Sequence, residues 1–504
     1  MPRPSARRAI AIGAVVLVLA TACSGGHEAQ TVVSDSAQAT QTSSTVLAPP
    51  PPPPTAAATP DFATVSKLID DAIAARRLPG AVVVVGHGGK VVFKKAFGMR
   101  KLDGQQGLEG SPARAEPMTE DTIFDMASLT KPLATATVVM QLYEQGKVQV
   151  DDPVQNYLPD FNPSNDSQRG EVTVRMLLTH YSGEAGEVEL GDPWGLDGAD
   201  KAEGIHRALT KPLQSRPGEV FRYSDINYIL LGALIEKVTG EAEDVYVQRN
   251  VFGPLGMRDT RFLPAAKACG PHEIRGAAIG WAPGAVADCP ADTWSLDLLS
   301  RIAPTAIDED GRADPGMNPD LDYLLRGTVH DTTARRMGGV AGHAGVFSTA
   351  QDVSVFAQAL LDRLAGRPSE FPLTQATLEL MTTPQQPGYT AEQLQAANDA
   401  AAEAVATTPN TENPLLAPNY PAIEGQDLRG FGWDIDTFLS VPRGMVFPVG
   451  SFGHTGFTGT TLWMDPGSDT YVVLLSNSIH VRGSRPIQAL RGEVATAAAQ
   501  ALGL

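Results

Sequence analysis

The sequence predicts an α+β fold, in which both ends of the chain build one antiparallel sheet that is flanked by helices. A helical pattern followed by two strand patterns opens the ordered part near Phe62, and two strand patterns followed by a helical pattern close it near Leu502. Between them, roughly residues 128–430 read as helix and loop. Strands at the two ends and helices between them favour a mostly helical insertion into one sheet.

Each terminal element has its own signals. Residues 62–78 carry apolar side chains at helical spacing, and Pro79 and Gly80 end the pattern. The strands AVVVVG and KVVFKKAFG then flank a turn at 87–90. Near the other end, a strand that begins at His454 and a second strand flank the turn 465–468, Asp-Pro-Gly-Ser. Residues 486–502 supply the closing helix.

Composition excludes several classes of protein. The 504 residues include 39 Lys and Arg against 57 Asp and Glu, and a net charge of −18 argues against a nucleic-acid partner. Apolar residues make up 42% and charged residues 19%, as in globular proteins. Three cysteines are too few for a four-cysteine zinc site, and the histidines show no ligand pairing at helical spacing. We therefore expect no metal and no cofactor.

Residues 1–23 have the pattern of an export signal. Arginines precede an apolar stretch at 9–20, which is too short to span a membrane, and small residues follow it up to Cys23. The segment resembles a bacterial lipoprotein signal with Cys23 as the lipidated residue; the alternative is an ordinary secretory signal. Both predict an exported protein, and in the first case the N-terminal lipid is its only membrane contact. Residues 24–60 contain six consecutive prolines at 49–54, which favour an extended linker before a domain at 61–504.

Two further features lie inside the domain. Without Cys23, the chain retains Cys269 and Cys289, and an even pair in an oxidising compartment favours one disulfide. Two free thiols are the alternative. Residues 384–427 are rich in Ala, Pro, Asn and Gln, which is typical of a surface insertion.

The first candidate for chemistry is Ser128 with Lys131, at the start of a long apolar helix pattern. Spacing of three places both side chains on one helix face. Serine is a weak nucleophile that needs a base, and a lysine amine can serve where its neighbours lower its pKa. The plainer alternative is a helix cap followed by a solvated charge.

Two more candidates follow along the chain. Tyr223-Ser224-Asp225 precedes another helix pattern, and a tyrosine beside a lysine can share its proton. In His454-Thr455-Gly456, the glycine permits close approach of a substrate, and the N–H of Phe457 can point at a developing oxyanion. The plainer alternatives are a capped helix with a buried aromatic residue and a glycine-rich edge strand.

Together these motifs resemble the serine β-lactamase and penicillin-binding-protein superfamily, on its class C and esterase side. Members show S-x-x-K, then Y-x-N or Y-S-x, then K-T-G or H-T-G; here Ser128-Leu129-Thr130-Lys131, Tyr223-Ser224-Asp225 and His454-Thr455-Gly456 stand in that order. Residues 172–186 resemble the "LLTHTSG" segment and residues 251–260 the "PLGM" turn. Residues 303–352 resemble a subgroup with D-Ala-D-Ala carboxypeptidases.

The resemblance implies a β-lactamase/transpeptidase-like fold and a set of residue roles. Ser128 would be the nucleophile, Lys131 its base and Tyr223 the proton relay. The N–H groups of Ser128 and Phe457 would form the oxyanion hole. The resemblance places these residues on the substrate side: His454, Thr455, Gly456, Asp225 and, near the pocket, His343.

Two departures from the family pattern affect the expected substrate. Asp225 stands where class C enzymes have Asn, and His454 stands where they have Lys. Both changes argue against efficient β-lactam hydrolysis. We therefore expect an exported serine hydrolase that acts through an acyl-enzyme on an ester or amide of the cell envelope, with a small molecule or peptide as its partner. β-Lactamase activity and a non-catalytic wall-peptide-binding lipoprotein are the alternatives, and the oligomeric state stays open.

Overall fold

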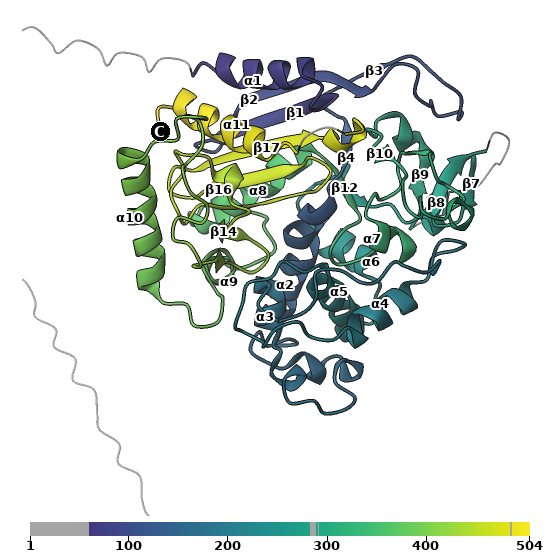
Figure 1. Ribbon diagram of the computed structural model, residues 1–504, viewed down its shortest axis with the longest axis horizontal. Helices are drawn as coiled ribbons and strands as arrows, with labels where there is room; N and C mark the ends of the chain where they lie inside the picture. Colours follow the sequence, from purple (N-terminus) through teal and green to yellow (C-terminus); the bar gives the residue numbers. More distant parts are fainter. Residues whose placement is uncertain (1–59, 283–288, 291, 484–485) are drawn as a thin grey trace, which may run out of the picture. The chain divides into compact units, whose positions relative to one another are not determined.

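The computed structural model describes residues 60–282, 289, 290, 292–483 and 486–504 (Figure 1). The predicted signal segment 1–23, including Cys23, lies outside the described residues, as does the linker 24–60 except for Pro60. None of the helices in the described ranges combines the length and hydropathy that crossing a bilayer requires.

The central sheet has eight strands in the order β13-β14-β15-β16-β17-β1-β2-β3. Adjacent strands are antiparallel throughout. The strands are β1 (Gly80–His87), β2 (Lys90–Lys101), β3 (Glu116–Pro117), β13 (Leu428–Arg429), β14 (Asp434–Asp436), β15 (Phe452–Thr455), β16 (Thr461–Asp465) and β17 (Thr470–Ser476). Because β1 pairs with β17, the two ends of the chain meet in the middle of the sheet, which confirms the predicted α+β architecture.

The valine run of β1 is buried on both faces of the sheet. Val83 and Val85 pack into a cluster with α1 (Ala63–Ala74) and α11 (Gln488–Ala501). Val82 and Val84 belong to the cluster on the other face, which includes α8 (Ala350–Leu364). Figure 1 shows α1 and α11 together on one side of the sheet. Full burial contributes about 1.5–3 kcal/mol per valine, so this strand reads as a continuous apolar run and not as an alternating one.

The part between the terminal hairpins is mostly helical, as predicted, but it also contains small sheets. Besides α8, its α-helices are α2 (Thr137–Glu144), α3 (Val174–Thr179), α4 (Lys201–Thr210), α5 (Asp225–Thr239), α6 (Glu243–Val247), α7 (Thr332–Arg336), α9 (Gln375–Thr382) and α10 (Ala391–Thr407). One small sheet joins β4 (Ile123–Asp125), β12 (Val346–Thr349) and β5 (Arg261–Phe262). The sequence pattern missed these strands because two to four residues are too few to show a period of two.

Helix α5 is the central helix of this part. Residues 226–235 are all buried, so other parts of the protein enclose the helix on every side. It contacts α3, α4 and the segment that follows Ser128. Because α5 is fixed on all sides, the residues at its N-terminus, Tyr223 to Asp225, are held in a rigid frame.

The segment 384–427 forms α10 and the loops on either side of it. Within α10, Ala397 alone is buried. Asn398 Nδ2 donates to Val449 O at 3.0 Å, and Asn413 Nδ2 donates to Glu493 Oε1 at 2.6 Å. These contacts attach the segment to the loop before β15 and to α11.

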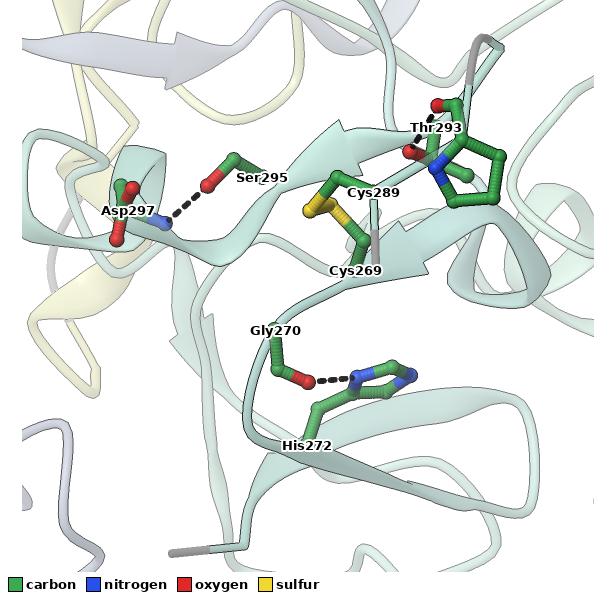
Figure 2. The surroundings of a disulfide bond; sticks show 8 residues. Cys269, Gly270, His272, Cys289, Thr293, Ser295 and Asp297 are labelled. Atoms are coloured by element: carbon green, nitrogen blue, oxygen red, sulfur yellow. Dashed lines mark hydrogen bonds between the residues drawn. A yellow bond between two sulfur atoms is a disulfide. The ribbon is translucent and has the colours of Figure 1, made fainter. Parts of the chain in front are cut away.

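Cys269 and Cys289 are joined in a disulfide (Figure 2), with their Cα atoms 5.3 Å apart. Cys269 belongs to β6 (Ala268–Cys269), which pairs in parallel with β9 (Trp294–Ser295). The disulfide therefore closes a loop at the edge of this small sheet.

Candidate active site

Ser128 and Lys131 do not lie on a regular α-helix. Ser128 is in a 3₁₀ turn, η1 (Ala127–Leu129), and Lys131 opens a π-helical segment, η2 (Lys131–Ala136), that leads into α2. Side chains three apart eclipse one another in a 3₁₀ turn, so the two residues still face the same way. Lys131 Nζ donates to Ser128 Oγ at 2.9 Å.

The residue before Ser128 has a strained backbone. Ala127 has φ +47°, a left-handed conformation that costs a residue with a Cβ about 1–3 kcal/mol. Its N–H donates to Asp125 Oδ1 at 2.9 Å, and the N–H of His330 donates to Asp125 Oδ2 at 2.7 Å. Burial raises the pKa of Asp125 to about 6, although these two hydrogen bonds lower it. The buried carboxyl thus ties the loop of Ser128 to the loop of His330.

Lys131 is fully buried, and oxygen atoms surround the three N–H donors of its ammonium. Besides Ser128, it donates to Asp225 Oδ1 at 2.7 Å and to His343 O at 3.2 Å. Burial lowers the pKa of Lys131, but the charges of Asp225 and Tyr223 outweigh burial and raise it. The lowered pKa that a lysine base requires is therefore absent in the resting protein, because an aspartate stands where the family pattern has Asn.

Tyr223 completes the group around Ser128. Its hydroxyl forms hydrogen bonds with Lys131 and Ser128, and its ring lies 4.9 Å from Lys131 Nζ. Burial raises the pKa of Tyr223, and this effect is larger than the opposite effect of the Lys131 cation, which lowers it. The next residue, Ser224, caps α5 by accepting from the N–H of Asn227 at 3.3 Å.

His180 supports Tyr223, a role that the sequence did not reveal. Its ring centroid lies 4.5 Å from that of Tyr223, and its Nδ1 accepts from the N–H of Ser224 at 3.1 Å. His180 lies in the stretch LLTHYSG, which carried the resemblance without an assigned role. A ring packed at a tilt against the tyrosine restricts the direction of the phenol toward Ser128.

Behind Lys131 lies a cluster of acids with a histidine. His343 is buried, and its Nε2 lies 2.9 Å from Asp331 Oδ1. Burial lowers the pKa of His343, but the charge and hydrogen bond of Asp331 raise it above its usual value. Ligand atoms of Asp225, Asp331 and His343 lie within 4.8 Å of one another, a spacing that a metal ion can bridge. Lys131 already pairs with Asp225, however, and His343 with Asp331.

The motif His454-Thr455-Gly456 ends a strand, contrary to the prediction that it begins one. β15 stops at Thr455, and a turn at 456–460 leads to β16. A Cβ at Gly456 would lie 2.4 Å from Met126 O and 2.1 Å from Thr460 Oγ1. A residue without a Cβ is therefore needed here because the segment that carries Ser128 packs against it. The sequence suggested a different reason, namely close approach of a substrate.

His454 is buried and neutral. Its Nδ1 lies 2.8 Å from Thr455 O, and since a carbonyl only accepts, Nδ1 carries the proton. Burial lowers the pKa of His454 well below its usual value, and the cations Arg429 and Lys131 lower it further. Nε2 is therefore a free acceptor, and it has no hydrogen-bond partner among the described residues. In this state His454 cannot supply the positive charge that a carboxylate prefers.

A cavity of about 730 Å³ brings the predicted residues together. Its walls include Ser128, Tyr223, Asp225 and the run His454 to Phe457. The backbone N–H groups of Ser128 and Phe457 have no acceptor among the described residues and are available for an oxyanion. Lys131 and His343 lie outside the wall. The sequence did not predict these wall residues: Glu187, His330, Asp331, Arg429, Phe438 and Arg491.

Two regions contribute nothing to this cavity. None of the described residues of 384–427 lines it. A second cavity of about 530 Å³, between α6 and Trp294, contains no residue of the three motifs. The catalytic chemistry is therefore expected in the cavity of Ser128.

Comparison with known proteins identifies a family and similar relatives. The Beta-lactamase family model matches residues 65–495. An N-acetylmuramyl-L-alanine amidase of Bacillus subtilis (strain 168) is 30% identical over 432 residues, which cover 84% of this chain and 82% of that protein. A protein of Escherichia coli (strain K12) described as "Putative D-alanyl-D-alanine carboxypeptidase" is 28% identical over 414 residues, covering 80% and 79%.

A solved structure shares the fold. A class C beta lactamase from Rhodobacter sphaeroides aligns with a TM-score of 0.52 and 20% identity, over 88% of this chain and 99% of that one. This likeness confirms the predicted fold, a large antiparallel sheet flanked by helices.

Proposed function

The chain belongs to the Beta-lactamase family, and from this premise we propose that it is a serine hydrolase that cleaves amide bonds through an acyl-enzyme. The observation that carries the proposal is the hydrogen-bonded group in which Lys131 Nζ and the Tyr223 hydroxyl both contact Ser128 Oγ. A nucleophile with a proton acceptor and a relay within hydrogen-bond distance is the arrangement that acyl transfer requires.

In the acylation step, Ser128 Oγ attacks the carbonyl carbon while its proton passes to Lys131 in the amine form. The N–H groups of Ser128 and Phe457 stabilise the oxyanion. Removing one such donor typically lowers kcat by about 10²–10³-fold. The C–N bond then breaks, and Tyr223 donates its proton to the leaving nitrogen. Tyr223 recovers a proton from Lys131, so the hydrogen of the serine ends on the leaving amine.

In the deacylation step, water attacks the ester that Ser128 has formed. Its proton passes to the same lysine and tyrosine and returns to Ser128 Oγ as the acid leaves. Every group returns to its starting state, and the net reaction is hydrolysis of one amide.

The relatives indicate the substrate class. The names of two relatives refer to D-alanyl-D-alanine in one case and to N-acetylmuramyl-L-alanine in the other. We infer that the substrate here is a peptide amide of the cell envelope and that residues 1–60 export and anchor the protein through Cys23. A neutral His454 supports this choice over a β-lactam, since no lysine stands at that position.

The test is covalent labelling followed by mass spectrometry. A fluorophosphonate should add its mass to the tryptic peptide that contains Ser128, and a Ser128→Ala variant of unchanged circular dichroism should stay unlabelled and lose turnover of a neutral ester. Arg367→Gln, at the surface and away from the cavity, is the matched control and should label normally. A protein that binds wall peptides but forms no adduct on Ser128 would instead be the binding lipoprotein.

A further inference from the structure

Arg491 is a buried cation without a charge partner. It is 7% exposed, and no carboxylate of the described residues forms an ion pair with it. Burial lowers its pKa to about 10, so the guanidinium stays charged at neutral pH. Arg491 lies near the start of α11, on the wall of the cavity of Ser128. A buried charge without a partner is unfavourable for folding, which indicates that the charge serves another purpose.

The guanidinium donates to the peptide group that carries one of the two oxyanion donors. Arg491 Nη2 donates to Gly456 O at 2.6 Å, and this carbonyl belongs to the same peptide group as the N–H of Phe457. Nη1 donates to Gln488 in the same helix, and Nε has no partner among the described residues. Because a trans peptide group is planar, the N–H points away from the carbonyl that Arg491 holds.

The turn at 456–460 keeps its shape without Arg491. The N–H of Gly459 donates to Gly456 O at 3.1 Å, so this carbonyl has a donor within the turn itself. Thr458 Oγ1 donates to Asp125 O at 2.7 Å, which fastens the turn to the segment before the nucleophile. The hydrogen bond of Arg491 therefore adds a charge to a peptide group that other contacts already hold in place.

A cation at the carbonyl of a peptide group strengthens the N–H of that group as a donor. Consecutive hydrogen bonds polarise one another, and a bond with a charged donor is stronger than one with a neutral donor. Here the peptide group connects the guanidinium of Arg491 to the N–H of Phe457, where the oxyanion would form. The positive charge is buried and no carboxylate cancels it, so it also attracts the developing negative charge through space.

We propose that Arg491 is a positioning residue of the oxyanion hole, which acts through Gly456 O to polarise the peptide group of Phe457. This inference rests on the proposed function and adds one residue to its machinery. Arg491 exchanges no proton, and it acts on the substrate only through this peptide group and its charge. Its effect grows as charge develops on the carbonyl oxygen, so it accelerates the reaction without changing the binding of a neutral substrate.

The experiment compares Arg491→Met with the wild type on a neutral ester. Methionine fills much of the same space without a charge or an N–H donor. We expect kcat to fall about 10- to 100-fold, less than for loss of an oxyanion donor itself, while KM stays within about twofold. Phenylboronic acid, which adds to Ser128 as a tetrahedral anion, should bind more weakly by a similar factor. Arg367→Met, at the surface, is the matched control and should equal the wild type in all three quantities.

Two further variants separate the charge from the hydrogen bond. Arg491→Lys keeps a cation and a donor, whereas Arg491→Gln keeps a donor without a charge. We expect Arg491→Lys to recover most of the wild-type kcat and to exceed Arg491→Gln by about 10-fold. Circular dichroism and the midpoint of urea unfolding show that each variant is folded, and this second comparison stands even where Arg491→Met is not.

Three results would overturn this role of Arg491: wild-type kcat in Arg491→Met, a loss confined to KM, or equal kcat in Arg491→Lys and Arg491→Gln. Unfolding of all three variants would also overturn it, because the turn would then need Arg491 for its structure. Failure of the proposed function looks different. In that case the wild-type protein itself forms no adduct with fluorophosphonate and hydrolyses no ester, and the role of Arg491 falls with it.

Discussion

Lys131 Nζ lies 2.7 Å from Asp225 Oδ1, closer than it lies to Ser128 Oγ. The ammonium that faces the nucleophile is therefore held by a carboxylate at the first position of α5. This pair links the two motifs and, in the proposed mechanism, sets the charge state from which acylation begins.

Asp225→Asn should shift the pH profile of the enzyme. Asparagine keeps the shape of the side chain but removes the negative charge that raises the pKa of Lys131, so burial then lowers it. Since the amine form accepts the proton of Ser128, the rising limb of kcat/KM should move to lower pH, by about one to three units for loss of a close charge partner. The measurement is kcat/KM for a neutral ester between pH 5 and 10.

Asp192→Asn serves as the control, because Asp192 pairs with Arg207 at the surface, and its profile should match the wild type. A rising limb that stays in place or moves to higher pH in Asp225→Asn would show that Lys131 is not the proton acceptor.

Gly456→Ala should disrupt the oxyanion hole. A new Cβ meets Met126 O at 2.4 Å, so β15 and the Ser128 loop must separate. Displacing the N–H of Phe457 should cost about 10²–10³ in kcat, and the overpacking about 1–3 kcal/mol of stability. Gly467→Ala has its nearest contact at 3.4 Å, to Asp465 Oδ1, and should behave like the wild type. Equal kcat for both variants would remove Phe457 from the mechanism.

Glu243→Gln should weaken the pH dependence of stability. Glu243 is buried beneath η2, where it accepts from Thr135 Oγ1 at 2.7 Å, and burial raises its pKa from 4.5 to about 7. Between pH 4.5 and about 7, Glu243 keeps its proton in the native state but has released it in the unfolded state. The stability of the wild type therefore falls as the pH rises through this range and levels off above it. Glutamine does not titrate, so the variant should gain stability relative to the wild type as the pH rises from 4.5 to about 7, by at most about 1.4 kcal/mol per pH unit.

Urea unfolding at four pH values measures this difference. Glu219→Gln changes an exposed carboxylate and should keep the wild-type slope. Glu184, whose pKa burial also raises to about 7, contributes equally to all three proteins and cancels. A Glu243→Gln slope equal to that of the wild type would mean that Glu243 is ionised at neutral pH.

Removing the disulfide should lower stability without changing the chemistry. The bond closes a loop with a sequence separation of 20, and cross-linking a loop of this size stabilises a protein by about 3 kcal/mol. Neither cysteine lines the cavity, so Cys269→Ser with Cys289→Ser should lower the free energy of unfolding by about 2–4 kcal/mol and keep kcat within about twofold. Peptide mapping without reductant should show the linked peptides in the wild type. Unlinked peptides, or an unchanged midpoint in the variant, would contradict the bond.

The sequence by itself determined the layout of the fold and supplied the candidates for the reacting groups. Its terminal hairpins and helices predicted the sheet because a strand buried on both faces and an amphipathic helix have patterns that repeat within a few residues. Ser128, Lys131 and Tyr223 were found because their order along the chain is a motif. Each of these features depends on residues that are close together in the sequence, or on the order of such segments along the chain. The sequence therefore reveals them without a structure.

The tertiary structure decided the charge states and the shape of the cavity. Whether Lys131 is an amine or an ammonium depends on Asp225, 94 residues away, and whether His454 is charged depends on burial and on Arg429. The reason is that electrostatic energies depend on distance through space and on exclusion of water. No pattern in the chain records either quantity, so Arg429 and Arg491 looked like any other arginines until the fold placed them beside His454.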